Sequence, residues 1–203
     1  MHPATMLVFA ATVLPLVCTP GPDTLFVASQ GLSGGPRAAM RANFGVLLGY
    51  AMHAVLAAFG VAALVAASPL LFEILRWVGV VYLAYLAMKL IRSALHPGHL
   101  SLAQTPGDAL VRRGFLTSFL NPKGMMVYFA ILPNFMIPGD GVALQAAVLS
   151  AIFIALCAII YGAVGLMVAS IARRGSFSDR RRRCVEGAAG ALLIFAAGRL
   201  AVN

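Results

Sequence analysis

The chain has 203 residues, of which 61% are hydrophobic and only 10% charged, and its formal net charge is +9. Soluble domains carry roughly 25% charged residues, so this composition excludes a water-soluble globule. It predicts an all-α integral membrane protein, with residues 1–203 forming a single transmembrane domain.

Six apolar stretches approach or exceed the roughly 20 residues that a transmembrane helix needs. These stretches are residues 4–31, 42–67, 69–94, 114–136, 142–171 and 184–202. They predict a bundle of six transmembrane helices that leaves no room for a further domain.

The basic residues predict the orientation of this bundle. If the spans alternate, the loops after the first, third and fifth spans share one side of the membrane. All but Arg76, Lys123 and Arg199 of the 15 Lys and Arg residues lie on that side. The positive-inside rule places these loops in the cytoplasm and both termini in the periplasm. The charge thus indicates orientation and not nucleic-acid binding. At the arginine run 180–183, binding of anionic membrane lipid headgroups is the alternative to a topology anchor.

The first span is interrupted by Thr19-Pro20-Gly21-Pro22-Asp23. Proline lacks an N–H donor and clashes with the preceding turn, so two prolines predict a broken helix. Irregular backbone at membrane depth is tolerated where it is packed in protein or lines a cavity. An acid at such a break indicates a functional site. The structural alternative is a kink whose carboxylate pairs with a neighbouring helix.

The second span carries Gly45 and Gly49, four residues apart, which predict a face for close helix packing. His53 follows one turn later. A histidine changes charge with modest changes in its surroundings, so His53 is a candidate proton relay. A buried histidine bonded to a carbonyl is the alternative.

The fourth span carries a second break at Asn121-Pro122-Lys123. If this span enters from the cytoplasm near Gly114, Lys123 lies about 14 Å inside, and Asp23 lies about 12 Å from the cytoplasmic end of its own span. Burying either charge alone is costly, so the similar depth predicts that Asp23 and Lys123 stabilise each other.

The two breaks also indicate an internal duplication. Residues 1–94 and 114–203 would be two three-helix repeats, each with a broken first helix, joined by a polar linker at 95–113. An odd number of spans makes such repeats inverted relative to each other. Inverted repeats whose broken helices meet near the midplane are a recurring plan of secondary transporters.

Other chemistry finds little support in the sequence. The three cysteines have no paired spacing, no metal-ligand or catalytic motif is present, and the sequence calls for no cofactor. A nucleotide-binding Gly-rich loop is also missing, so transport would draw on a gradient or on a partner protein.

Four motifs match a known family. They are Pro20-Gly21-Pro22-Asp23, the pair Gly45 and Gly49, the segment 77–83 followed by Lys89, and Asn121-Pro122-Lys123 followed by Leu132-Pro133 and Phe135. In these motifs, and along essentially its whole length, the chain resembles the LysE/RhtB family of amino-acid exporters. The resemblance implies export of amino acids or close derivatives across the inner membrane by proton antiport. Many relatives carry Asn where Asp23 stands, so the acid is expected to alter ion coupling or substrate choice.

The expected site comprises both breaks and the histidine: Thr19, Pro20, Gly21, Pro22, Asp23, His53, Asn121, Pro122 and Lys123. Backbone groups of the breaks would bind the charged ends of the substrate, while Asp23 exchanges a proton for Lys123 or the substrate ammonium. Export of another small solute or ion, a membrane-embedded enzyme and a channel stay open as alternatives. A homo-oligomer is compatible with the sequence.

Overall fold

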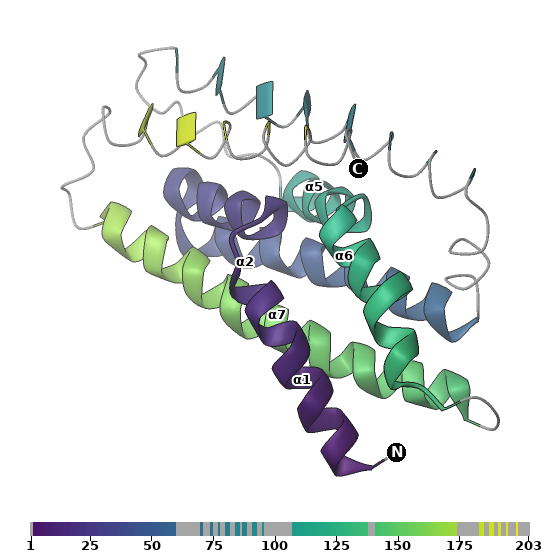
Figure 1. The fold of residues 1–203 in the computed structure, drawn as a ribbon. Coiled ribbons are helices and arrows are strands. Elements are labelled where there is room, and N and C mark those ends of the chain that lie inside the picture. Colours follow the sequence, from purple (N-terminus) through teal and green to yellow (C-terminus); the bar gives the residue numbers. More distant parts are fainter. Residues whose placement is uncertain are drawn as a thin grey trace.

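The computed structural model describes residues 2–59, 107–137 and 141–173, together with single positions between 70 and 95 and between 183 and 198. In this part of the chain every regular element is a helix (Figure 1), which confirms the all-α membrane fold class. The expected third and sixth spans, 69–94 and 184–202, fall largely outside the described residues.

The first break is where the prolines predict it. Helix α1 (Pro3–Cys18) ends just before it, and α2 (Pro22–Ala58) begins with Pro22 at its first position. The two helices are bent by 54°. Pro20 and Pro22 cannot donate to the carbonyls one turn earlier, so the helix cannot continue through 19–21.

Helix α2 is itself folded back at Gly35. This glycine has φ 73° and ψ −168°, a combination that only glycine adopts readily, and Pro36 follows it. The hydroxyl of Tyr50 bonds to the carboxylate of Asp23. A straight helix would separate those residues by about 40 Å, so the two arms of α2 must run antiparallel. The sharp turn replaces the loop expected between the first two spans.

The second broken helix starts earlier than expected. Helix α5 (Gly107–Phe119) begins within the stretch 95–113 that the sequence marks as a linker. After a bend of 51° the chain continues as α6 (Pro122–Met126), the π-helical η1 (Val127–Ile131) and the 3₁₀ turn η2 (Leu132–Phe135). Pro133 cannot donate to the preceding turn, which accounts for the change of helix type there.

Helix α7 (Val142–Arg173) agrees closely with the expected span 142–171. By length and apolar composition, its residues Val142–Ala172 can cross a membrane unaided. Among the described residues the count of spans rises to three if each bent pair is one span. The total of six therefore stays a prediction.

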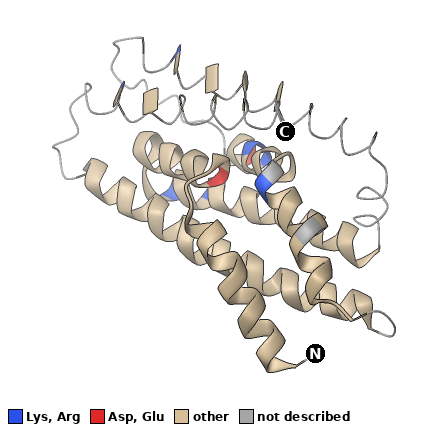
Figure 2. Ribbon diagram, in the orientation of Figure 1, with Lys and Arg blue, Asp and Glu red and all other residues tan. Residues whose placement is uncertain are grey.

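Helix α2 lies at the centre of the described bundle, packed against α7 on one side and α5 on the other (Figure 1). The buried core includes Phe9 of α1, Tyr50 of α2, Tyr128 of η1 and Phe153 of α7. Large apolar side chains also cover the outside, as for Leu7 and Ile159. Figure 2 shows α1 without charged residues and α7 nearly so, as a lipid-facing surface requires.

Candidate functional site

Asp23 lies at the first break, in the first turn of α2, and its side chain is buried, with 1% exposed. Its Oδ2 accepts hydrogen bonds from the hydroxyl of Tyr50 and from Nδ2 of Asn121, the latter at 2.5 Å. Its Oδ1 is buried without a hydrogen-bond partner. One oxygen of this carboxylate is thus saturated, and the other is free to take a proton or a cationic group.

Asn121 joins the second break to the first. It is fully buried and stands at the N-cap of α6, where its Oδ1 accepts a bond from the backbone N–H of Lys123 at 3.0 Å. Asn followed by Pro is a favoured start for a helix, because the side chain caps an unpaired N–H and proline needs no donor. Its Nδ2 remains available for Asp23, so one side chain serves both breaks.

Lys123 also crosses to the first break, but to its backbone. Its Nζ donates to the carbonyl of Thr19 at 2.6 Å. The same Nζ atom would lie 3.4 Å from a Cβ built on Gly21. In the described part of the chain Lys123 and Asp23 form no direct ion pair, although they lie close enough to interact electrostatically. Two separate hydrogen bonds therefore join the two breaks, one from Lys123 to Thr19 and one from Asn121 to Asp23.

The residues of the first break differ in exposure. Thr19 and Pro20 are exposed, Gly21 is partly buried, and Pro22 is buried. The hydroxyl of Thr19 is used locally, donating to the carbonyl of Pro15 at 2.7 Å. The backbone of 19–21, and not the threonine side chain, therefore faces the second break, where Pro122 opens α6.

His53 lies at the second break. Its Nε2 is 3.0 Å from the carbonyl of Phe119, the last residue of α5, and since a carbonyl only accepts, Nε2 carries the proton. The ring stacks between Phe119 and Tyr128, with centroid distances of 5.0 and 5.3 Å. Its Nδ1 is buried without a hydrogen-bond partner. The structure thus brings His53 to the Asn121 side of the site.

Tyr50 was not among the expected site residues, yet it is the second donor to Asp23. It is fully buried, and its own carbonyl accepts a bond of 3.0 Å from the hydroxyl of Tyr128. The positions of Asp23 and Tyr50 in the sequence could have indicated this contact. In a hairpin that turns at Gly35, residues 23 and 50 lie at similar distances from the turn and therefore at similar depth.

Gly45 and Gly49 lie where α2 meets α5. A Cβ on Gly45 would be 2.9 Å from the Cα of Val111, and one on Gly49 would be 2.7 Å from the carbonyl oxygen of Phe115. Beside them, the hydroxyl of Ser118 donates to the carbonyl of Val46 at 2.8 Å. The two backbones approach this closely only because the glycines have no side chain.

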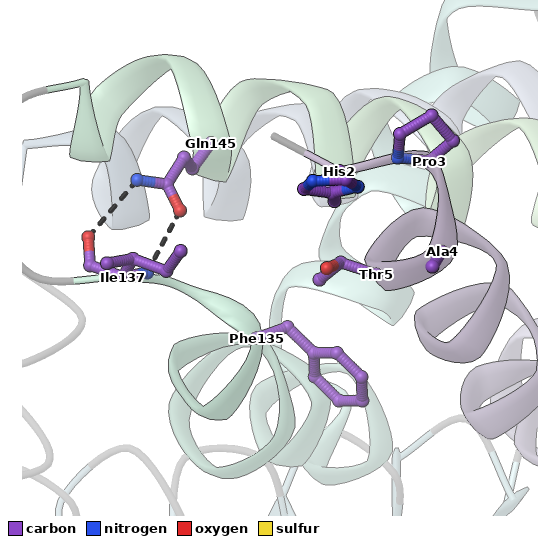
Figure 3. A pocket seen from close by; sticks show the side chains of 7 residues that line it. All are labelled: His2, Pro3, Ala4, Thr5, Phe135, Ile137 and Gln145. Atoms are coloured by element: carbon purple, nitrogen blue, oxygen red, sulfur yellow. Dashed lines mark hydrogen bonds between the residues drawn. The ribbon is translucent and has the colours of Figure 1, made fainter.

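A pocket of about 570 Å³ opens at the other end of α1, between its first turn, η2 and the start of α7. Its lining includes His2, Thr5 and Phe135 (Figure 3). Both amide atoms of Gln145 are occupied there by the backbone of Ile137, at 2.9 and 3.1 Å. The pocket is thus remote from Asp23, which follows the far end of α1.

No metal site is evident in the described part of the chain, where no three His, Cys, Asp or Glu side chains gather. Cys18 and Cys184 are exposed and Cys157 is buried, and all three are free.

Comparison with known proteins adds the family. The chain is 32% identical to a leucine efflux protein of Klebsiella pneumoniae over 122 residues, which cover 59% of this chain and 58% of that protein. It is 35% identical to a leucine efflux protein of Enterobacter over 123 residues, with the same shares covered. It is also 34% identical to an uncharacterized membrane protein of Vibrio cholerae over 137 residues, 65% of each chain. The matches thus span less than two thirds of these relatives. No solved structure matches the chain.

A family model described as LysE type translocator matches residues 14–203, which include both breaks and the glycine pair. The chain therefore belongs to the LysE type translocator family, and the resemblance drawn from its motifs is confirmed.

Proposed function

We propose that this protein is a secondary transporter that exports amino acids or close derivatives across the cytoplasmic membrane by proton antiport. Family membership supports transport of a small molecule, and the leucine efflux relatives support an amino acid as that molecule. Leucine and other amino acids with apolar side chains are therefore the first substrates to test.

The observation that carries this proposal is the bond between Asp23 and Asn121, which brings the two breaks together in the protein interior. Helix ends at such breaks present unpaired backbone N–H and C=O groups, which can bind the charged ends of a substrate. The breaks at 19–21 and 120–121 thus form one candidate site instead of two separate kinks.

Asp23 is the proposed proton carrier. Its Oδ1 is buried and has no hydrogen-bond partner, whereas two donors keep Oδ2 in place. In one state Oδ1 would hold a proton, and in the other it would bind the substrate ammonium. His53 is a second candidate on the proton path, because its Nδ1 is buried and unpartnered.

Alternating access would come from rocking of the two proposed repeats, 1–94 and 114–203, around the broken helices. The orientation proposed with it has both termini in the periplasm and the turn at Gly35 in the cytoplasm. Arg37 and Arg41, just after that turn, agree with the positive-inside rule.

Counterflow in proteoliposomes tests this function. Liposomes loaded with one unlabelled amino acid should accumulate the same labelled amino acid transiently. An inward proton gradient should drive efflux of the amino acid from the liposomes, whereas uptake would indicate symport and contradict antiport. Absence of counterflow for every amino acid would contradict amino-acid export. Conversion of the substrate would indicate an enzyme, and ion conductance without counterflow would indicate a channel.

A further inference from the structure

The ammonium of Lys123 has a neutral partner where a charged one is expected. In the described residues its hydrogen bond goes to the carbonyl of Thr19, while the carboxylate of Asp23 bonds Tyr50 and Asn121. A lysine ammonium has three N–H donors, and the carbonyl uses one of them. The other two donors are positively charged and do not bond to Asp23, so this arrangement favours an anionic ligand.

The ammonium can also be reached. The bond between Lys123 and Thr19 is exposed, although the lysine side chain is itself partly buried. The neighbouring residue is Gly21, and a Cβ built there would lie 3.4 Å from Nζ and 3.5 Å from Cδ of Lys123. Glycine at this position therefore leaves the space beside the ammonium open.

We infer that Lys123 binds the carboxylate of the transported amino acid, which replaces the carbonyl of Thr19 as its partner. This inference rests on the proposed function and specifies the substrate class of the same site: molecules with a free carboxylate. The ammonium of the substrate would bind to Asp23, whose Oδ1 has no hydrogen-bond partner. A zwitterion would thus be held between one charge from each break.

A purely structural role for Lys123 predicts something different. If the lysine only ties the second break to Thr19, its loss would weaken transport of every substrate equally. A carboxylate-binding lysine instead affects only ligands that carry the carboxylate. The discriminating measurement is therefore the preference for an acid over its amide, and not the transport rate.

The experiment uses the full chain in proteoliposomes and the amino acid that the wild-type protein exchanges best. Counterflow of that labelled amino acid is measured against rising concentrations of the unlabelled acid or of its carboxamide. Wild-type protein should bind the carboxamide at least about tenfold more weakly, as loss of a charge-assisted hydrogen bond implies. Lys123→Gln should lose this preference, although glutamine can still donate to Thr19. Lys123→Arg, which keeps the charge, should retain it.

Arg112→Gln is the matched control, because it removes one positive charge from an exposed position on α5. If Lys123→Gln does not fold, Gly21→Ala replaces it. The added methyl group would contact the ammonium and take up the space beside it. It should therefore reduce the preference for the acid over the carboxamide, and an unchanged preference would overturn the inference.

The inference is overturned if wild-type protein binds acid and carboxamide equally, or if Lys123→Gln keeps the wild-type preference. Both results leave amino-acid export standing, since counterflow itself is observed. Absence of any amino-acid counterflow would instead contradict the proposed function and, with it, this inference.

Discussion

The carboxylate of Asp23 and the carboxamide of Asn121 are 98 positions apart in the chain and 2.5 Å apart in the structure. Asp23 opens α2 just after the first break, and Asn121 caps α6 at the second. Both side chains are almost completely buried. This bond fixes how the two broken helices face each other, and the predictions below test what depends on it.

Two replacements of Asp23 should distinguish its role in folding from its role in proton-coupled export. In Asp23→Asn the amide oxygen can still accept from Tyr50 and Asn121, so the protein should fold, but it can no longer carry a proton. Export driven by a proton gradient should fall to the level of empty liposomes, while counterflow continues with weaker substrate binding, because the neutral amide no longer attracts the substrate ammonium. In Asp23→Leu two buried donors lose their acceptor, at about 1–3 kcal/mol each, and folded protein should decrease. Gradient-driven transport by Asp23→Asn at the wild-type rate would rule out the coupling role.

Replacing Asn121 should reveal its two separate tasks. Asn121→Ala removes the cap of α6 and the donor to Asp23, a loss of about 2–4 kcal/mol. Asn121→Ser keeps a capping oxygen for α6 but is too short to preserve the bond to Asp23. We expect thermal stability in detergent to rank wild type above Ser and Ser above Ala. Equal stability of all three would show that the bond between the breaks contributes nothing.

His53 gives a prediction about the proton path. Glutamine at this position can still donate to the carbonyl of Phe119 but does not titrate. If Nδ1 of His53 accepts the transported proton, His53→Gln should fold normally and change the pH dependence of transport, although Asp23 is still present. An unchanged pH profile would assign His53 to holding the end of α5 in place.

Gly45 and Gly49 of α2 should not tolerate a side chain. A methyl group on Gly45 or Gly49 meets the backbone of α5, which cannot yield without separating the helices. Gly45→Ala and Gly49→Ala should therefore lower the unfolding temperature, against the usual gain of roughly 0.5–1 kcal/mol for Ala over Gly in a helix. Gly198→Ala is the control, since nothing lies within 4 Å of its Cβ position. If Gly45→Ala and Gly49→Ala are as stable as Gly198→Ala, the close packing of α2 against α5 is contradicted.

Topology can be tested by labelling single cysteines in a background without native cysteines. Arg37→Cys, beside the turn of α2, should react with an impermeant reagent only after the cells are broken. Ile137→Cys, which is 72% exposed near the expected outer end of the second broken helix, should react in intact cells. The reverse pattern would invert the proposed orientation.

The sequence by itself determined the features that depend on local chemistry. Two prolines within 19–23 interrupt the first helix, and Pro122 interrupts the fourth span, because proline lacks an N–H donor and clashes with the preceding turn. The apolar run of α7 likewise predicts its own helix to within two residues. The family followed from the same short motifs.

Only the tertiary structure decided which groups are partners. Depth along a helix placed Asp23 and Lys123 at one level but could not show which way each side chain turns, and the lysine bonds to Thr19 while Asp23 bonds Tyr50 and Asn121. Tyr50 reaches Asp23 because α2 reverses at Gly35, a backbone conformation that the sequence permits without requiring. Partner choice depends on how helices rotate and cross, and that is set by packing across the whole bundle rather than by any single segment.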